Sequence, residues 1–234
     1  MEKILEVKHL TKVFKNGVSE IYAVKDMTFD VSEGELVIIL GPSGAGKSTL
    51  LNLIGGMENA TEGELIVDGE NIINYNKKQL ALYRRDKVGF VFQFYNLMSN
   101  LTALENVELS TDMKKDSMDP VEALKMTGLK YRMNSFPSQL SGGEQQRVSI
   151  ARAIAKNPSI LLCDEPTGAL DYRTGKKILK ILQNIAKEQH KAVIIVTHNS
   201  ALQDMGDKII KIKNGKIEEL IINETTKDIE EIVW

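Results

Sequence analysis

The sequence predicts an α/β fold in which a parallel β-sheet core carries an antiparallel β edge and an inserted α-helical segment. Short apolar runs recur along the chain and are separated by longer stretches of helical character. Continuous apolar strands are typical of a sheet that is buried on both faces. Near the N-terminus two segments instead alternate apolar with polar residues, which is the pattern of a half-buried antiparallel pair.

The antiparallel edge comes first in the chain. Residues 4–14 and 22–31 show the alternation, and Asn16-Gly17 between them is a turn signal. Two further dipeptides, Asp68-Gly69 and Asn214-Gly215, predict tight turns between short strands.

The strands of the parallel core follow as β-branched apolar runs, each short enough for one strand. They cover residues 35–40, 88–92, 159–163, 192–197 and 208–212.

Between residues 96 and 157 helical periodicity replaces the strand pattern, with Val148, Ala151 and Ala155 on one face. No repeat, low-complexity tract or Pro- or Ser-rich linker interrupts the chain, which favours one domain over residues 1–234. We expect a core of about residues 1–95 and 158–220, a helical subdomain of about 96–157 and a tail of 221–234.

The tail carries Ile229, Ile232 and Val233 at helical spacing, which predicts a short amphipathic helix docked on its own domain. Trp234, the only tryptophan, would report on that docking by fluorescence.

Composition excludes several classes of protein. Lys and Arg number 30 against 32 Asp and Glu, so the formal net charge of −2 argues against binding nucleic acid through bulk positive charge. The longest apolar runs have four or five residues, and the N-terminus lacks the apolar segment of a secretory signal. One cysteine, Cys163, leaves no internal disulfide. We therefore expect a cytoplasmic protein.

A glycine-rich loop follows the expected strand at 35–40 and leads into an apolar helix start. The pattern G-x-x-x-x-G-K-S in this position predicts a phosphate-binding loop, whose N–H groups and helix N-terminus hold the anion. Lys47 would reach the β- and γ-phosphates of a nucleotide, and the Ser48 hydroxyl would ligate Mg²⁺. The candidate residues are Gly41, Pro42, Ser43, Gly44, Ala45, Gly46, Lys47, Ser48 and Thr49.

Two adjacent acids, Asp164 and Glu165, end the apolar run at 159–163. A carboxylate at the tip of a buried strand beside a phosphate loop suits a Mg²⁺ site, and its neighbour can polarise the attacking water. We assign Asp164 to the metal and Glu165 to the general base. Two acids after a strand are otherwise common in exposed turns, and the nearby phosphate loop favours the functional interpretation.

The third motif spans residues 140–147, Leu-Ser-Gly-Gly-Glu-Gln-Gln-Arg. Ser141 and Glu144 form a capping box that opens a helix. The pair Gly142 and Gly143 exposes N–H groups at the positive helix end and so predicts a second anion site. One nucleotide can use both anion sites if two copies of the chain pack head to tail.

These motifs resemble those of the ATP-binding-cassette (ABC) ATPases, over residues 5 to about 220. The resemblance implies a P-loop NTPase fold with a RecA-like core. Residues 41–49 match the Walker A motif, 160–164 match Walker B and 140–145 match the family signature. Glu144 differs from the residue that the signature commonly has at that position. Ser141, Gly142, Gly143 and Glu144 would then contact the nucleotide of the opposite subunit.

The resemblance also assigns three residues that would not stand out alone. Gln93 matches the Q-loop glutamine, which touches Mg²⁺ and the attacking water, and Asp171 matches the D-loop. His198 matches the switch histidine that contacts the γ-phosphate, and Asn199 stands where the family usually has Asp. The implied catalytic set is Lys47, Gln93, Glu165 and His198, and the implied Mg²⁺ set is Ser48, Gln93 and Asp164.

Adenine binding calls for an aromatic face. Phe14 matches the A-loop position of the family, which is commonly Tyr, and Tyr22 is the competing candidate.

Three segments, 84–93, 101–108 and 166–171, further resemble the macrolide-exporter and lipoprotein-release ATPases. This resemblance implies an ATP-hydrolysing homodimer on the inner face of the membrane, bound to transmembrane permease subunits, with an extracytoplasmic adaptor as a further candidate partner. Alternatives are a regulator of cell-wall hydrolases or an importer cassette. A soluble ATPase acting on DNA or ribosomes is disfavoured, and we expect no nucleic-acid partner.

Overall fold

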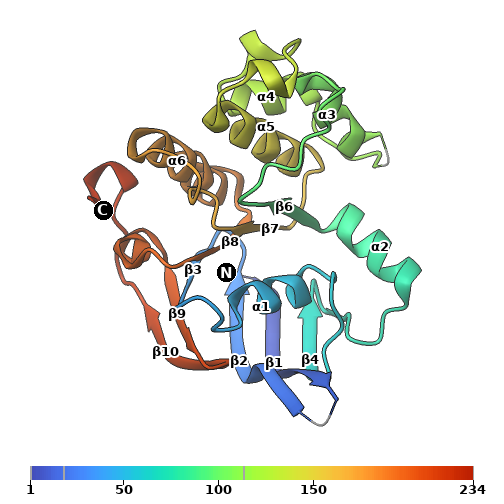
Figure 1. Cartoon of the computed structure of the whole chain (residues 1–234), viewed down its shortest axis with the longest axis vertical. Coiled ribbons are helices and arrows are strands. Elements are labelled where there is room, and N and C mark those ends of the chain that lie inside the picture. Colours follow the sequence, from blue (N-terminus) through green and yellow to red (C-terminus); the bar gives the residue numbers. More distant parts are fainter. Residues whose placement is uncertain (1, 18, 113, 234) are drawn as a thin grey trace.

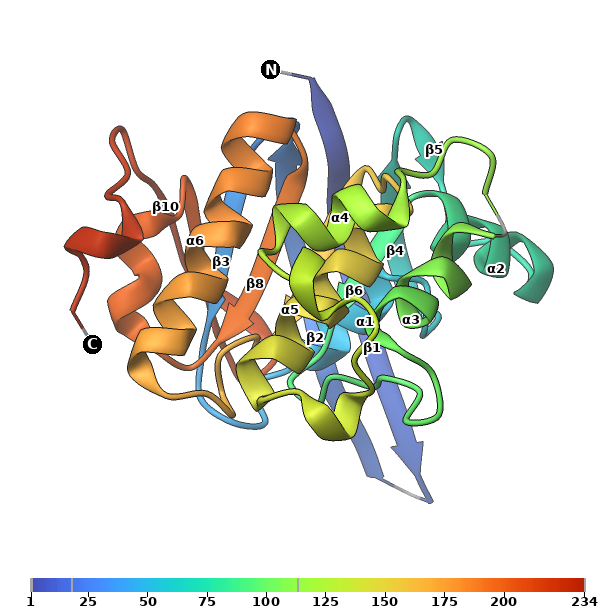
Figure 2. The same cartoon turned by 90° about the horizontal axis from the view of Figure 1, so that it is seen from above.

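Two β-sheets and two groups of helices build the structure, a computed structural model that describes residues 2–17, 19–112 and 114–233. In Figure 1 the six-stranded sheet lies between the four-stranded sheet and the helices α3, α4 and α5. Figure 2 shows α6 beside α3–α5 on the same side of the sheet. No helix in the described part of the chain combines the length and the apolar character needed to cross a bilayer.

The six-stranded sheet forms the predicted parallel core. Its order is β10-β9-β3-β8-β7-β6, and every pair except β10 with β9 is parallel. All residues of β3 and β8 are buried, as the continuous apolar runs predict. The strands are β3 (Leu36–Leu40), β6 (Val88–Val91), β7 (Ile160–Asp164), β8 (Ala192–Thr197), β9 (Lys208–Lys213) and β10 (Lys216–Ile222).

The antiparallel edge is a separate four-stranded sheet, in the order β2-β1-β4-β5. It contains β1 (Lys3–Asn16), β2 (Ser19–Ser32), β4 (Glu62–Val67) and β5 (Glu70–Asn71). Register shifts interrupt the β1–β2 ladder near Leu10, Lys12 and Val13, which bend and twist this long ribbon.

Eight-residue α1 (Lys47–Ile54) follows the glycine-rich loop. The helical segment contains α3 (Ala103–Thr111), α4 (Pro120–Met126) and α5 (Gly142–Ala155), and capping boxes open both α3 and α5. Two helices were not assigned individually from the sequence: α2 (Lys77–Asp86) and α6 (Tyr172–Gln189). Short 3₁₀ turns cover Lys130–Arg132 (η1), Pro137–Gln139 (η2), Ser200–Met205 (η3) and Ile229–Glu231 (η4).

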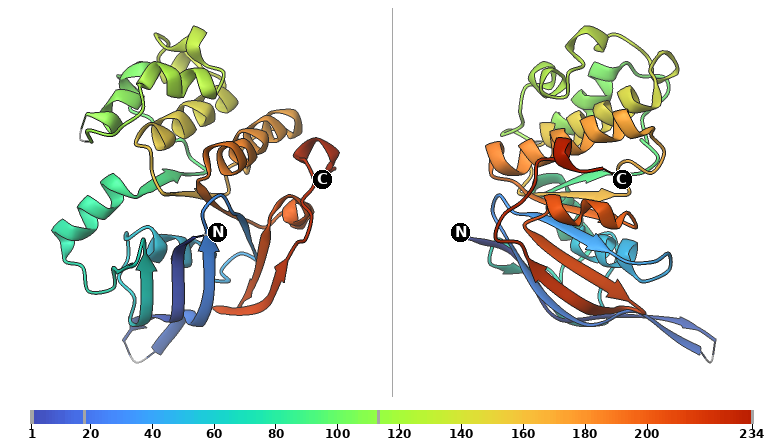
Figure 3. Two further views of the ribbon diagram at one scale, coloured as in Figure 1. Left: turned by 180° about the vertical axis from the view of Figure 1, so that it is seen from behind. Right: turned by 90° about the vertical axis from the view of Figure 1, so that its left-hand side faces the viewer.

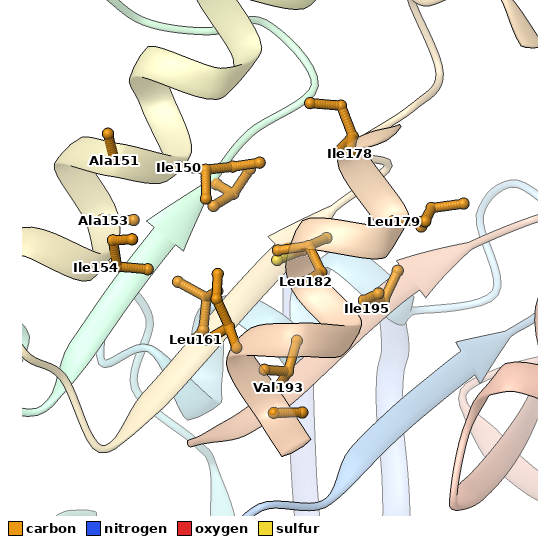
Figure 4. Packing of buried hydrophobic residues seen from close by; sticks show 14 of the residues in the cluster. Ile150, Ala151, Ala153, Ile154, Leu161, Ile178, Leu179, Leu182, Val193 and Ile195 are labelled. Atoms are coloured by element: carbon orange, nitrogen blue, oxygen red, sulfur yellow. The ribbon is translucent and has the colours of Figure 1, made fainter. Parts of the chain in front are cut away.

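Apolar residues of the parallel sheet point alternately into two cores. Leu161, Val193 and Ile195 face the helices, where Figure 4 shows them against side chains of α5 and α6. Their neighbours Leu162 and Ile194 face α1 and the antiparallel sheet. The period-two geometry of a strand thus joins the two halves of the molecule through one buried sheet.

The tail docks on its own domain, but its predicted amphipathic helix is wrong. In the described part of the tail, up to residue 233, the one helical element is the 3₁₀ turn η4, which Asp228 caps by accepting from the Glu230 N–H. Ile229 and Ile232 are buried, whereas Val233 is 81% exposed, so the apolar residues do not share one helical face. Figure 3 shows this segment beside α6. Trp234 lies outside the described residues.

Candidate nucleotide site

A cavity of about 830 Å³ opens where the carboxyl ends of β3, β7 and β8 meet. The edge formed by strand carboxyl ends is where α/β sheets bind ligands. The residues that line the cavity come from six segments of the chain: Ile21, Tyr22, Ala23, Ser43, Gly44, Gly46, Lys47, Ser48, Thr49, Gln93, Asp164, Glu165, Gly168, His198, Asn214 and Gly215.

The loop over residues 41–46 is shaped by close backbone approaches. A Cβ at Gly41 would lie 2.3 Å from the Ile212 carbonyl oxygen, and one at Gly46 would lie 2.0 Å from that of Ala23. Gly46 also has φ of +102°, which side chains rarely adopt. It serves as the N-cap of α1 without a side-chain cap, so the first N–H groups of that helix remain available to an anion.

Lys47, at the start of α1, is 8% exposed and folds back over the loop. Its ammonium donates hydrogen bonds to the carbonyl oxygens of Gly41, at 2.7 Å, and Pro42, at 3.0 Å. The loop thus places a buried positive charge beside the N–H groups that face the cavity, which is the arrangement that phosphate groups require.

Ser48 and Asp164 bring oxygen atoms together beside this loop. The Ser48 hydroxyl donates to Asp164 Oδ1 at 3.3 Å. Burial raises the pKa of the Asp164 carboxyl because its charge loses hydration, and the hydrogen bond from Ser48 opposes this rise. A partly desolvated carboxylate and a hydroxyl fit Mg²⁺, a hard cation that prefers oxygen ligands.

Glu165 directs its carboxylate into the cavity from a strained backbone. Its φ is 45°, in the left-handed region, just after β7. Glu165 Oε1 lies 2.7 Å from His198 Nδ1, and Oε2 accepts a hydrogen bond from the Thr197 hydroxyl at 3.2 Å. The Glu165 side chain is 19% exposed and that of His198 is 72% exposed, so the imidazole covers the carboxylate at the mouth of the cavity.

Gln93 also lines the cavity, just past the end of β6. Its amide packs on the turn after Glu165, where a Cβ at Gly168 would lie 3.1 Å from Gln93 Nε2. Asp171 is not among the lining residues, and instead caps α6 by accepting from the Thr174 N–H at 3.1 Å.

The signature residues lie elsewhere, in a depression of about 240 Å³ that includes Ser141, Gly143 and Glu144. The predicted capping box is present, because Glu144 Oε2 accepts from the Ser141 N–H at 2.9 Å and the Glu144 N–H donates to the Ser141 hydroxyl at 3.3 Å. The hydrogen bond from the Ser141 N–H and the nearby Arg132 lower the pKa of the Glu144 carboxyl. Among the described residues that line the 830 Å³ cavity, none belongs to the signature.

The paired glycines of the signature have a packing role that sequence reasoning missed. A Cβ at Gly143 would lie 2.2 Å from Cγ2 of Thr174, and one at Gly142 would lie 2.7 Å from the Tyr95 hydroxyl. The start of α5 therefore approaches α6 and the segment after Gln93 more closely than any larger residue would allow.

The structure separates the two adenine-stacking candidates. Tyr22 lines the cavity and Phe14 is not among its lining residues. Phe14 nevertheless pairs across the β1–β2 ladder with Ile21, which does line the cavity, so the two side chains share one face of the ribbon. The Lys12 ammonium lies 4.8 Å from the centre of the Phe14 ring and covers one of its faces.

Two features of the site were not anticipated. The first is the hydrogen bond from the Thr197 hydroxyl to Glu165. The position of Thr197 at a strand end, directly before His198, is the sequence signal that could have pointed to it. A second cavity, of about 360 Å³, lies between α2, β6 and the helical segment. It is lined by Ala81, Arg84, Arg85, Phe90, Phe92, Ser110, Arg152, Ala153 and Lys156.

Comparison with known proteins agrees with this geometry. Residues 24–168 match the family model described as ABC transporter. An uncharacterized ABC transporter ATP-binding protein of Methanocaldococcus jannaschii, MJ0796, is 47% identical, over 92% of this chain and 95% of that protein. The macrolide export ATP-binding/permease protein MacB of Bradyrhizobium diazoefficiens is 42% identical, over 92% of this chain and 34% of that longer protein.

Solved structures give the same result. The dimeric structure of a post-hydrolysis state of the ATP-binding cassette MJ0796, bound to ADP and Pi, superposes with a TM-score of 0.85 at 44% identity, covering 93% of this chain and 98% of that one. The expected P-loop NTPase fold and the resemblance to the exporter-type branch are confirmed. With its phosphate loop, Asp164, Glu165, Gln93 and His198 assembled around one cavity, the chain belongs to the ABC transporter ATP-binding family and is an ATPase of that family.

Proposed function

We propose that the chain drives an exporter-type or mechanically transmitting membrane complex as a head-to-tail dimer with ATP bound between the two copies. The observation that carries this proposal is the separation of two anion sites: the phosphate-loop cavity and the signature depression share no lining residue. A symmetric dimer would bring the cavity of one copy to the signature of the other. The dimeric structures of the similar MJ0796 cassette support this arrangement.

Within each composite site we assign roles from the geometry above. The loop N–H groups and Lys47 bind the phosphates, and Lys47 exchanges its two carbonyl partners for phosphate oxygens. Ser48, Asp164 and Gln93 hold Mg²⁺, which when bound neutralises charge that develops on the phosphates. In the opposite copy Ser141, Gly142, Gly143 and Glu144 complete the site, and Asp171 lies near the junction.

Glu165 acts as general base toward the attacking water, because its carboxylate is fixed in the cavity by Thr197 and His198. His198 also contacts the γ-phosphate in this proposal, so it links the base to the bound nucleotide. Phe14 stacks on adenine with the ring face that Lys12 leaves open, and Tyr22 is the alternative.

The 360 Å³ cavity is the site where we place the membrane partner. It is lined by Phe90 and Phe92, whose rings stack with centroids 5.3 Å apart. Arg84, Arg152 and Lys156 line the same cavity and give it positive charge. We infer that the occupant is an acidic, apolar-faced cytoplasmic helix of a transmembrane permease. The chain would thus act at the inner face of the membrane, and an adaptor on the outer side would contact only that permease.

Complementation between two inactive variants tests the dimer. Lys47→Ala inactivates the phosphate loop and Ser141→Arg inactivates the signature, so neither variant alone should hydrolyse ATP. In a mixed dimer one composite site combines the intact halves of both chains, and ATP hydrolysis should return on mixing. A mixture that stays inactive while both variants remain folded would contradict the head-to-tail arrangement.

Charge reversal tests the permease site. Tagged chain purified from detergent-solubilised native membranes should retain a membrane protein that Arg84→Glu and Lys156→Glu each release. Lys213→Glu, on the exposed β9–β10 hairpin, is the matched control and should leave the complex intact. Identification of the retained protein distinguishes the alternatives: a partner with a large extracytoplasmic domain supports an exporter or a cell-wall-hydrolase regulator, and an associated solute-binding protein supports an importer.

A further inference from the structure

One fully buried carboxamide links the helix that begins at the signature to the backbone beside two residues of the nucleotide cavity. Gln146 lies in α5, five positions after Ser141, and is 0% exposed. Its Nε2 donates to the carbonyl oxygen of Phe92 at 3.3 Å and to that of Pro166 at 2.9 Å. Phe92 directly precedes Gln93, and Pro166 directly follows Glu165. The helix that begins at the signature therefore holds the backbone next to both cavity residues.

The same helix also forms hydrogen bonds to the segment that follows Gln93. The guanidinium of Arg152 donates to the carbonyl oxygens of Asn96, at 2.6 Å, and Tyr95, at 3.0 Å. Backbone on both sides of Gln93 is thus bonded to α5. A displacement of α5 would carry this segment with it, because several short hydrogen bonds would otherwise break.

Gln146 leaves one polar atom unsatisfied in the core. Its Oε1 is buried with no hydrogen-bond partner. Reversing the carboxamide would place Oε1 against the two carbonyl oxygens of Phe92 and Pro166, so these carbonyls fix its orientation. A buried acceptor without a donor is destabilising. Gln146 therefore fits a positioning role better than a purely structural one.

We propose that Gln146 is a positioning residue for ATP hydrolysis, whose carboxamide makes α5 move together with the backbone beside Gln93 and Glu165. This inference rests on the proposed head-to-tail dimer, in which the N-terminus of α5 meets nucleotide held by the other copy. When that contact shifts α5, the Phe92 and Pro166 carbonyls shift with it, and the two cavity side chains reach their working positions. Gln146 does not touch the nucleotide itself.

Gln146→Met tests the proposal, because methionine keeps the length of the side chain and removes both donors. We expect kcat for ATP to fall by about tenfold or more, since small misplacements of catalytic groups have effects of this size. KM for ATP should stay within about threefold of wild type, because the phosphate loop is intact. The thermal midpoint should fall less than in the control variant below, because the loss of the two donated hydrogen bonds is partly offset by removal of the unsatisfied acceptor.

Gln183→Met is the matched control. Gln183 is 1% exposed in α6, and its Nε2 donates to the Lys227 carbonyl oxygen at 2.9 Å, away from the cavity. This variant should lower the thermal midpoint and leave kcat unchanged. A kcat for Gln146→Met within about twofold of wild type would overturn the proposal, and so would equal losses of kcat in the two variants.

Hydrogen exchange supplies a readout that does not depend on the rate. With Mg²⁺ and a non-hydrolysable ATP analogue, wild-type amides of residues 92–96, 165–168 and 142–148 should gain protection over the same range of analogue concentration. In Gln146→Met, the amides of residues 165–168 should no longer gain protection over the same concentration range as the other two segments. Independent protection of the three segments in the wild type would overturn the inference, even if the variant did not fold. A wild-type chain that hydrolyses no ATP would instead contradict the proposed function.

Discussion

At the residue scale, three charged side chains at the cavity are positioned by the ends of strands and by the glycine-rich loop. Asp164 is partly desolvated, Glu165 has a left-handed backbone, and Lys47 is bonded to carbonyl oxygens of its own loop. Asp164, Glu165 and Lys47 could be predicted from the sequence, because a strand end and a glycine-rich loop fix where such side chains point. Gln146 could not, because one glutamine in a helix carries no signal of the two loop carbonyls that tertiary packing brings to it.

Asp164→Asn should stabilise the nucleotide-free protein while it abolishes ATP hydrolysis. The substitution removes a carboxylate whose charge is penalised by burial, and the amide can still bond to Ser48. A gain of about 1 kcal/mol would raise the thermal midpoint by about 2–4 °C. Calorimetry with and without Mg²⁺ and ATP checks this prediction. A midpoint below that of wild type in the absence of ligands would contradict it.

Lys156 should make the free energy of unfolding depend on pH in the alkaline range. Burial lowers the pKa of its ammonium from the ordinary 10.5 to about 8. Below pH 8 both folded and unfolded chains carry the proton, and the folded chain bears the whole penalty of burial. Between about pH 8 and 10.5 the folded chain releases the proton while the unfolded chain keeps it, so the free energy of unfolding rises with pH.

Denaturant titrations at several pH values, compared with Lys156→Met, isolate this effect from other groups. As the pH rises across this interval, the free energy of unfolding of the wild type should increase by about 1–3 kcal/mol relative to that of the variant. Parallel pH profiles for the two proteins would show that the pKa of Lys156 is not lowered.

At the scale of elements, strands were easier to predict than the tail. Residues 36–40 and 192–196 are apolar throughout, and such short runs are typical of strands buried on both faces. The tail instead takes its shape from partners on α6, where Lys180 pairs with Asp228 and Gln183 accepts from the Ile229 N–H. Spacing within the tail contains no record of these contacts, so the predicted helix did not form.

The contact between α5 and α6 gives a prediction about the signature glycines. Gly143→Ala should lower the free energy of unfolding by about 1–3 kcal/mol, because its Cβ would overlap Cγ2 of Thr174. Thr174→Ser removes that methyl group and keeps the hydroxyl. Denaturant titration of the double variant should show recovery of most of the loss caused by Gly143→Ala. A loss in the double variant equal to the sum of the losses in the two single variants would exclude this steric cause.

At the scale of the whole molecule, the proposed composite site is divided between two copies, so that each chain would carry half of each of two sites. The fold class and the phosphate-loop cavity follow from the local pattern of the sequence. The second half of the site depends on another copy, and only the separation of the cavity from the signature depression indicates it here. The cationic cavity at α2 was likewise missed, because its arginines and phenylalanines come together from three segments.

Glu165→Gln should trap the dimer. The variant keeps the shape of the side chain but lacks the base, so ATP and Mg²⁺ should bind without being hydrolysed and hold two copies together. Light scattering should give twice the monomer mass of 26.1 kDa with ATP and Mg²⁺, and the monomer mass without them. The same substitution combined with Lys47→Ala is the control and should stay monomeric. A monomeric Glu165→Gln chain with nucleotide bound would argue against the composite site.

The docking of the tail on α6 also decides how the protein should be handled. The Lys176 ammonium donates to the Glu230 carbonyl oxygen, which fixes the last described turn beside the start of α6, a few positions from Asp171. An affinity tag fused to the C-terminus would therefore project next to the surface expected to meet the second copy. Assembly and turnover measurements should therefore be made with N-terminally tagged or untagged chain.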